Sequence, residues 1–260
     1  MGTWANCCDI DLCCDTVRGA PSEGKVMHAA DYEDYAKWKG WEPGDFLVCT
    51  PHEASYFAGE LRNVPVEGAR VLEIGFGNGN FLRFASDRGA TISGTELLDE
   101  AVASARRCGI RVYRPDLSDA TAESAGQFDL VAAFDVLEHM TFDEIIEVFE
   151  SLSRLLRVGG HVIARFPNGQ SPLGRAPQYG DRTHRSILSS PLLMQLLQAK
   201  PWMLERADNP FVVVQDRSLI RGIGLRLRLA GRRVVERSVN RLYGLEVTLD
   251  PNVTVLLRRI

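Results

Sequence analysis

The middle of the chain alternates short apolar runs with segments whose apolar residues recur at helical spacing. The run from Phe128 to Phe134 is almost continuously apolar, as expected for a strand buried on both faces of a parallel sheet. Thr141 and Glu144 form the capping-box pattern that starts a helix. After the run that begins at Val71, we expect strands at 90–96, 110–116, 128–134 and 161–166, and helices at 80–88, 99–108 and from Thr141 onward. This order predicts an α/β fold with a doubly wound parallel sheet.

The last third of the chain gives weaker signals. Ser190 and Pro191 are typical of the cap and first residue of a helix, which we expect to reach about Ala199 before Pro201. Residues 253–257 (VTVLL) predict a last strand. The strand before it is the hardest to place, and we place it at residues 211–215 (FVVVQ).

A glycine-rich turn follows the first apolar run. Residues 71–82 read VLEIGFGNGNFL, with glycines at alternate positions (Gly75, Gly77, Gly79) and an acid, Glu73, before them. A buried strand that ends in such a turn lets the backbone approach a ligand closely and points helix amides at it. An acid at the strand end suits a cationic ligand. Position 80 is Asn, so the spacing differs from the G-x-G-x-x-G of dinucleotide-binding proteins.

This run resembles motif I of the class I S-adenosylmethionine (SAM) methyltransferases. The resemblance covers residues 55–168 well and the rest of the chain loosely. It implies a Rossmann-like fold with seven mostly parallel strands, helices on both faces of the sheet, and SAM as cofactor, with S-adenosylhomocysteine as its product. It also implies that the glycine-rich loop faces the cationic amino-acid moiety and the sulfonium of SAM.

Further positions along the chain fit the same cofactor. Glu96 ends the second expected strand, where an acid can accept two hydrogen bonds from a ribose diol, although it could also be an acid that stabilises a helix N-terminus. The resemblance implies that Asp116 and Leu117 meet the adenine. An NAD-binding Rossmann protein is the rival interpretation, and the missing third glycine and the Asp116 motif weigh against it. The expected cofactor-binding residues are Glu73, Gly75, Gly77, Asn78, Gly79, Glu96, Leu97, Asp116, Leu117, Phe134 and Asp135.

We divide the chain into a leader and cap at residues 1–60 and a methyltransferase domain at residues 61–260. Seven aromatic residues lie between Tyr32 and Phe57. In class I methyltransferases, segments before motif I often cover the cofactor and shape the substrate pocket. The alternative is that these aromatics only pack helices against the sheet.

The fourth expected strand is followed by DVLEHM and not by the Asn-Pro-Pro-Tyr type of loop found in many nucleobase and glutamine methyltransferases, which disfavours base N-methylation. A hydroxyl acceptor needs a general base, and His suits this role near neutral pH. The candidates are His139, directly after that strand, and His184, with Asp181 three residues earlier to orient its ring. Packing near the cofactor (His139) or a surface loop (His184) are the structural alternatives. We expect His161 to be structural.

Several segments are also similar to methyltransferases encoded with polysaccharide and O-antigen biosynthesis, namely KWKGWEPGDF, PNGQSPLG, YGDRTHRSILSSPLLMQLL and DPNVTVLLRR. This narrower resemblance implies methylation of a sugar or glycan hydroxyl. A small-molecule methyltransferase of a natural-product or quinone pathway and a non-catalytic SAM-binding scaffold protein stay open as alternatives.

A basic segment is inserted before the last strand. Residues 217–241 hold eight arginines and one acid, although the net charge of the whole chain is −4. Apolar residues between the arginines predict a basic amphipathic helix at about 217–243, which could lie on an anionic membrane or could be an ordinary helix with a solvated face. The sequence pI of about 5.8 argues against nucleic acid as a partner.

The remaining composition suggests a cytoplasmic protein, because the chain has no apolar run long enough to cross a membrane and its start fits neither a signal peptide nor a myristoylation pattern. Cys7, Cys8, Cys13 and Cys14 form two vicinal pairs. The pairs lack the C-x-x-C spacing of a zinc site, so reduced thiols are expected and a metal is the alternative. No metal is expected among the site residues.

Overall fold

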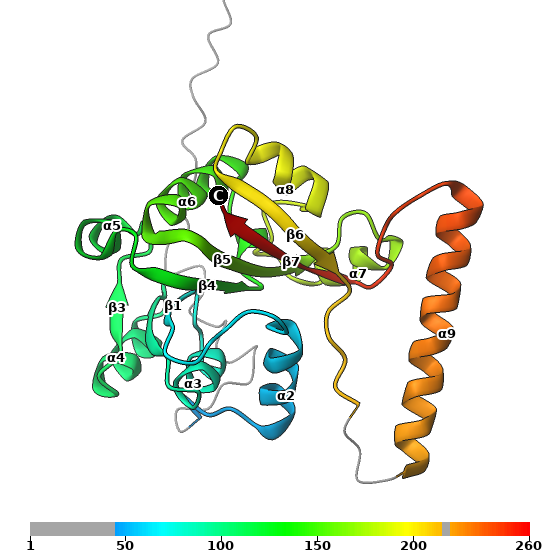
Figure 1. Ribbon diagram of the computed structural model, residues 1–260, viewed down its shortest axis with the longest axis horizontal. Coiled ribbons are helices and arrows are strands. Elements are labelled where there is room, and N and C mark those ends of the chain that lie inside the picture. The colour runs from blue at the N-terminus through cyan, green and yellow to red at the C-terminus, as the bar shows by residue number, and fades with distance from the viewer. Residues whose placement is uncertain (1–44, 215–218) are drawn as a thin grey trace, which may run out of the picture.

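The computed structural model describes residues 45–214 and 219–260 as an α/β domain (Figure 1). Its seven-stranded sheet has the order β3-β2-β1-β4-β5-β7-β6. Only β7 runs antiparallel to its neighbours, β5 and β6. The predicted fold class is therefore confirmed. The strands are β1 (Arg70–Ile74), β2 (Thr91–Thr95), β3 (Arg111–Tyr113), β4 (Phe128–Phe134), β5 (Leu156–Pro167), β6 (Trp202–Asp208) and β7 (Asn252–Arg259).

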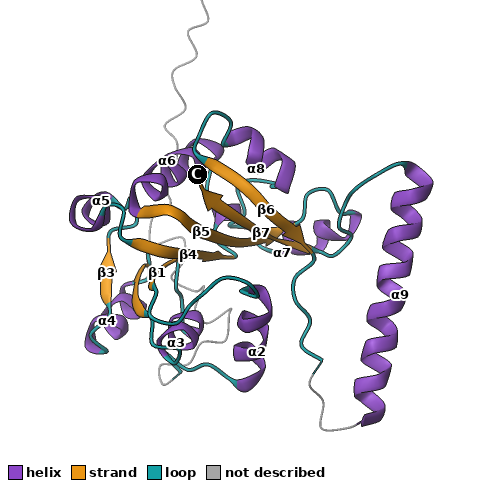
Figure 2. Ribbon diagram, viewed as in Figure 1, coloured by secondary structure: helices purple, strands orange, loops and turns teal. Residues whose placement is uncertain are grey.

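Helices cover both faces of the sheet (Figure 2). They are α2 (Pro51–Glu60), α3 (Asn80–Ser86), α4 (Asp99–Arg107), α5 (Ser118–Ser124), α6 (Phe142–Leu155), α7 (Arg175–Gly180), α8 (Ser190–Leu196) and α9 (Leu219–Tyr243), with short 3₁₀ helices η2 (Leu137–His139) and η3 (Pro172–Gly174). Adjacent β1 residues enter different cores, because side chains alternate across a strand. Leu72 belongs to a core with Phe149 of α6, and Val71 to a core with Phe81 of α3.

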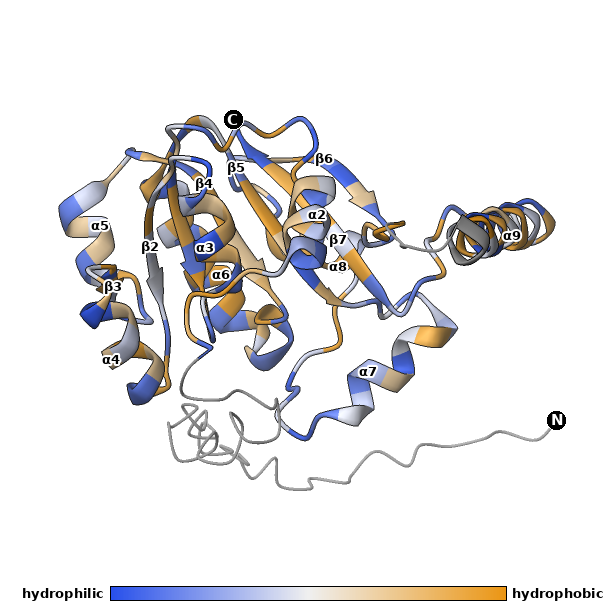
Figure 3. Ribbon diagram, turned by 90° about the horizontal axis from the view of Figure 1, so that it is seen from below, coloured by the Kyte–Doolittle hydropathy of each residue, from blue (hydrophilic) through white to orange (hydrophobic). Residues whose placement is uncertain are grey.

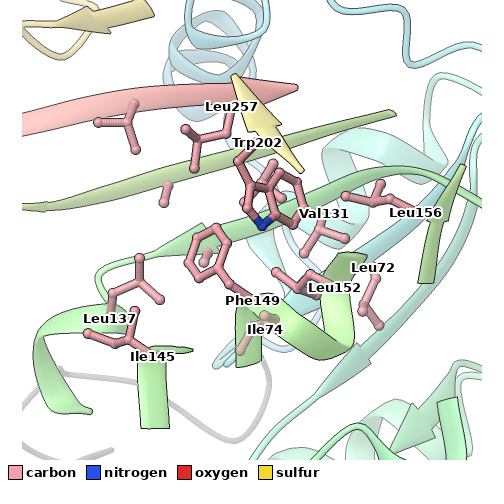
Figure 4. Close-up of a cluster of buried hydrophobic side chains, with 14 of the residues drawn as sticks. Leu72, Ile74, Val131, Leu137, Ile145, Phe149, Leu152, Leu156, Trp202 and Leu257 are labelled. Carbon is pink, nitrogen blue, oxygen red and sulfur yellow. The ribbon is translucent and has the colours of Figure 1, made fainter. Parts of the chain in front are cut away.

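The core beside α6 is the larger of these two. The ring of Phe149 meets the indole of Trp202 edge to face, with 5.5 Å between their centroids (Figure 4). The predicted capping box starts α6, since the Thr141 hydroxyl accepts a hydrogen bond from the Glu144 amide and the Glu144 carboxylate accepts one from the Thr141 amide. The cap and the buried apolar stripe together explain why this helix forms where the sequence predicts it.

Two expected strand positions differ from the structure. The sixth strand is β6 (Trp202–Asp208), and residues 211–214 form neither helix nor strand, so the expectation at 211–215 is wrong within the described residues. Residues 211–214 instead attach this segment to the domain. Val213 is buried, and the amide of Phe211 donates to the Glu60 carboxylate at 2.8 Å. β6 is an edge strand with only part of its surface covered, so its sequence lacks a continuous apolar run.

β5 is longer than expected. It begins at Leu156 and not at 161, so that the Gly159–Gly160 pair lies inside the strand. Gly159 has a φ of 81°, and the pairing with β4 shifts register between Phe128 and Leu130. The glycines therefore produce an irregularity in a continuous strand.

The predicted basic helix is present as α9, and it stands apart from the sheet in two perpendicular views (Figures 1 and 3). None of the helices in the described ranges is long and apolar enough to cross a bilayer. The leader cysteines and the aromatics from Tyr32 to Trp41 lie outside the described residues.

Candidate cofactor and acceptor site

A pocket of about 460 Å³ opens at the carboxyl ends of β1, β2 and β4. The glycine-rich loop forms one wall through Gly75, Gly77 and Asn78, whereas Gly79 is not among the lining residues. Gly75, Gly77 and Gly79 all have positive φ angles, at 63°, 51° and 74°. A Cβ atom on Gly75 would lie 2.8 Å from the side chain of Val136. Glycine is therefore required at this position both for its conformation and for the close approach of the loop after β4.

Glu96 ties the loop after β1 to the loop after β2. One carboxylate oxygen accepts the Gly77 amide at 2.7 Å, and the other accepts the amides of Leu97 at 2.6 Å and Leu98 at 3.1 Å. The oxygen that accepts only the Gly77 amide has a second lone pair, so the group keeps acceptor capacity toward the pocket that it lines. This arrangement suits hydroxyl donors such as a ribose diol.

Glu73 is a buried acid that lines the same pocket. One of its carboxylate oxygens has no hydrogen-bond partner among the described residues. Burial, and then the nearby charge of Glu96, raise the pKa of the Glu73 carboxyl well above its ordinary value. A buried acid with an unsatisfied oxygen in a pocket fits a ligand that brings a positive charge, and the ammonium and sulfonium of SAM are such groups.

The loop after β4 is held by an ion pair that the sequence did not reveal. Arg165 of β5 donates to both carboxylate oxygens of Asp135, with 2.8 Å from Nε to Oδ1, and to the hydroxyl of Tyr56 at 2.7 Å. Asp135 needs this support because its φ is 56°, in the left-handed region. Burial lowers the pKa of Arg165, but Asp135 and Tyr56 outweigh it and raise that pKa, so the guanidinium stays charged.

Most expected cofactor residues line the pocket: Glu73, Gly75, Gly77, Asn78, Glu96, Leu97, Phe134 and Asp135. The expected adenine contacts lie at its edge, where Pro115 is the lining residue. Asp116 is exposed and accepts from the amide and hydroxyl of Ser118, which lower the pKa of its carboxyl. Leu117 is buried, and its amide donates to the carbonyl of Arg114 at 2.9 Å.

His139 lies on η2 and lines the pocket. The Thr183 hydroxyl lies 2.9 Å from its Nδ1 and donates to the Asp181 carboxylate at 2.5 Å. Asp181 therefore reaches His139 through Thr183. Its distance to Nε2 of His184 is 3.9 Å, longer than a hydrogen bond.

The ring of His184 packs edge to face against that of His139, with 4.8 Å between the centroids. His184 is not among the pocket-lining residues. Its Nδ1 lies 3.0 Å from the carbonyl oxygen of Gln178. Glu138, the neighbour of His139, is 2% exposed, and its carboxylate comes within 4.0 Å of His184 Nε2. The sequence singled out both histidines but not Glu138 or Thr183, although these four residues and Asp181 form one cluster. As expected, His161 sits away from the pocket, where it pairs with Glu205 at 3.2 Å.

Residues 52–207 match the family model described as "Methyltransferase domain". Two similar curated proteins are each named ubiquinone biosynthesis O-methyltransferase. The one from Escherichia coli O157:H7 is 29% identical over 152 residues, which are 53% of this chain and 62% of that protein. The one from Vibrio parahaemolyticus is 30% identical over 101 residues, which are 36% of this chain and 42% of that protein. The chain thus spans less than two thirds of these relatives.

Solved structures share the fold at low identity. A SAM-dependent methyltransferase from Archaeoglobus fulgidus has a TM-score of 0.55 and 16% identity, covering 79% of this chain and 94% of that one. The phosphoethanolamine N-methyltransferase 2 of Haemonchus contortus, solved with SAM, has a TM-score of 0.56 and 16% identity, covering 90% of this chain and 60% of that one.

Proposed function

This chain belongs to the family with the methyltransferase domain, and on that premise we propose that it transfers the methyl group of SAM to a hydroxyl of a small molecule or glycan. The observation that carries the proposal is that His139 and the glycine-rich loop line one pocket. An imidazole suited to activate a hydroxyl thus faces the same space as a loop suited to hold the methyl donor.

The two ends of SAM would occupy different parts of the pocket. The cationic methionine end fits beside Glu73, whose buried oxygen lacks a partner among the described residues. The ribose hydroxyls fit Glu96, and the adenine then lies toward Leu97, Leu98 and Pro115. Asp116 would reach the adenine only if its side chain left Ser118. This orientation directs the sulfonium toward the loop after β4.

The acceptor hydroxyl would enter beside His139 and Met140, which line the pocket next to the loop after β4. The His139–His184 pair, in which Thr183 and Asp181 hold His139 and the Gln178 carbonyl holds His184, takes up the proton as oxygen attacks the methyl carbon. Placing the hydroxyl in line with the sulfonium supplies much of the rate, since proximity and orientation can contribute roughly 7–11 kcal/mol.

Two acceptor classes remain candidates. A sugar or glycan hydroxyl follows from the resemblance of the segments around PNGQSPLG and YGDRTHRS. A phenolic hydroxyl of a quinone precursor is favoured by the similarity to the two ubiquinone biosynthesis O-methyltransferases. The test is a panel of a catechol and a glycoside with vicinal hydroxyls, incubated with methyl-labelled SAM. An O-methyl ether from either one supports the proposal. Transfer to nitrogen acceptors alone would contradict it.

A membrane surface is the partner that α9 fits best. Ile223, Leu227 and Val234 are exposed at one helical face. Exposed arginines, namely Arg226, Arg233 and Arg237, flank this stripe on one side. An exposed apolar stripe beside a row of arginines is typical of a helix lying in the surface of an anionic membrane.

The opposite side of α9 is attached to the domain. The Glu236 carboxylate accepts hydrogen bonds from the Asn209 side chain and the Leu249 amide, both at 2.8 Å. Arg232 also pairs with Asp250. The apolar stripe is therefore presented outward, and membrane contact would bring the enzyme to acceptors carried on lipids.

A further inference from the structure

We infer that the guanidinium of Arg165 binds a carboxylate carried by the acceptor, so that the site selects an acidic acceptor. Among the described residues that line the pocket, Arg165 is the one arginine or lysine. It lies on β5 and is paired in register with Phe134 of β4, which also lines the pocket. Its side chain is 24% exposed, so the group is neither sealed in the core nor free in solvent.

Arg165 keeps hydrogen-bond donors after its contacts within the protein are made. Nε and Nη2 donate to the two carboxylate oxygens of Asp135, and Nη1 donates to the Tyr56 hydroxyl. Because a guanidinium has five N–H hydrogens, one hydrogen on each terminal nitrogen has no acceptor among the described residues. Hydrogen bonds from arginine to a carboxylate are shorter and stronger than those between neutral groups. These hydrogens therefore favour a carboxylate over a neutral hydroxyl.

The guanidinium is held in place before a ligand binds. Its central carbon lies 5.3 Å from the ring centroid of Tyr56 and 5.7 Å from that of Phe134, over both rings. The two hydrogen bonds to Asp135 fix the orientation of its plane. A planar guanidinium that is already ordered loses little further freedom when it binds an anion. Arg165 is therefore preorganised for such a ligand.

The strand order, together with the proposed function on which this inference rests, places Arg165 on the acceptor side of SAM. The strands β2, β1, β4 and β5 are neighbours in that order. In the proposed orientation SAM extends from Glu96, directly after β2, past Glu73 on β1 to the loop after β4. Arg165 lies on the next strand, β5. A molecule bound beyond the methyl group therefore meets its guanidinium.

The acids that line the pocket have other partners. Both carboxylate oxygens of Asp135 accept from Arg165 itself. The Glu53 carboxylate accepts hydrogen bonds from the cap of α2 with one oxygen and from the first residue of α3 with the other. Glu73 and Glu96 are the acids that we assign to SAM. The remaining donors of Arg165 are thus available to the acceptor.

This chemistry fits one kind of molecule in each of the two candidate acceptor classes. A glycan acceptor would contain a uronic acid, whose ring carries hydroxyls and a carboxylate. A phenolic acceptor would be a hydroxylated aromatic acid. The shared feature is a hydroxylated ring with one carboxylate, and the choice between the two sources is left to experiment.

The test compares two pairs of compounds whose members differ by a carboxylate. Protocatechuate is paired with catechol, and methyl glucuronide with methyl glucoside. Each compound is titrated calorimetrically into the full chain saturated with S-adenosylhomocysteine. In one pair we expect the acid to bind about 10–100-fold more tightly, as a hydrogen bond to a charged group provides. The pair that shows this preference identifies the source of the acceptor.

Three variants assign the preference to Arg165. Arg165→Gln should make the two members of that pair bind equally. Arg165→Lys keeps the charge but loses the planar fork, so it should retain only part of the preference. Arg157→Gln is the matched control, because Arg157 also lies on β5 and pairs with an aspartate of β4, Asp129, at 2.5 Å, but near the opposite ends of these strands. It should keep the full preference.

Equal binding of both members in each pair by the parent protein overturns the inference, and this result does not depend on the folding of any variant. An Arg165→Gln variant that binds SAM more weakly but keeps the preference also overturns it and assigns the guanidinium to the donor. Methyl-transfer assays with the same compounds separate the two proposals. A preference in binding without transfer to any hydroxyl supports the carboxylate site and contradicts the proposed function. Transfer to oxygen without any preference leaves O-methyl transfer standing and removes the carboxylate site.

Discussion

The carboxylate of Glu96 accepts a hydrogen bond from the amide of Gly77 at 2.7 Å, so the acid after β2 holds the glycine-rich loop after β1. Glu96→Ala removes both this hydrogen bond and the carboxylate proposed to accept the ribose hydroxyls. Hydrogen bonds to charged groups contribute about 1.5–3 kcal/mol, so we expect SAM to bind roughly 10–100-fold more weakly. Titration calorimetry with SAM measures this, and Glu100→Ala on the exposed start of α4 is the control. Unchanged affinity in Glu96→Ala would remove it from the cofactor site.

Glu73→Gln tests the buried acid through the pH dependence of stability. Burial and the Glu96 charge raise the folded-state pKa of Glu73 well above the unfolded value of about 4.3. Between these values the folded protein holds a proton that the unfolded chain has lost, so the free energy of unfolding falls as pH rises. Glutamine does not titrate, so the variant should lose less stability through this window.

Thermal melts from pH 4 to 8 without SAM measure the Glu73 effect, with the exposed Glu67→Gln as control. Glu73→Gln should also bind SAM more weakly, because it removes the negative charge from the cationic end of the ligand. Identical pH profiles for the parent protein and Glu73→Gln would mean that this carboxyl is not protonated by its burial.

Gly75→Ala should destabilise the protein more than Gly68→Ala. Both glycines have positive φ, at 63° and 68°, which costs an alanine about 1–2 kcal/mol. Only at Gly75 does the added Cβ meet another side chain, 2.8 Å from Val136. Urea unfolding compares the two variants, and adding Val136→Ala to Gly75→Ala should recover part of the difference. Equal losses at both positions would show that the close approach of Val136 has no energetic consequence.

His184→Ala should keep SAM affinity and lose turnover. His184 packs against His139, where the acceptor is proposed to enter, and does not itself line the cofactor pocket. His139→Ala should behave in the same way, because His139 lines the pocket beside Met140, where the acceptor is proposed to enter, and not beside Glu73 or Glu96. Loss of a group that activates the hydroxyl typically lowers the rate about 10²–10⁴-fold. Single-turnover assays and SAM titrations separate the two effects, with His161→Ala as control. Normal turnover in both cluster variants would exclude them from the chemistry.

Leu227→Glu and Val234→Glu place charges in the outward stripe of α9. We expect each to reduce sedimentation with vesicles containing phosphatidylglycerol, and added salt to reduce binding of the parent protein because it screens the arginines. Leu173→Glu, at an exposed apolar position on η3, is the control. Binding to neutral vesicles that matches binding to anionic ones, or self-association through α9 without vesicle binding, would refute the membrane proposal.

The sequence predicted the parts of the fold and site that local patterns encode. The glycine-rich loop, the acids at the carboxyl ends of β1 and β2 and the capping box of α6 each lie within a few residues of the element that they define. β6 was misplaced because an edge strand lacks a continuous apolar run.

Contacts between distant segments left no such local pattern. Tyr56 and Arg165 are 109 residues apart in the chain yet share a hydrogen bond, and Thr183 reaches His139 from 44 residues away. Asp181 was expected to orient His184, and in the structure its contact with His139 runs through Thr183. These relationships depend on how β4, β5 and the segment after α7 pack, which one sequence does not specify residue by residue.

The most direct test of the account is methyl transfer to oxygen. Purified protein would be incubated with methyl-labelled SAM and a fractionated lysate of its host, and label would be followed into polysaccharide, lipid extract, small molecules and protein. We expect the label to appear as an O-methyl ether in the glycan, lipid or small-molecule fraction, and His184→Ala to abolish it. Measurable SAM binding with no label in any fraction would contradict it and identify a non-catalytic SAM-binding protein.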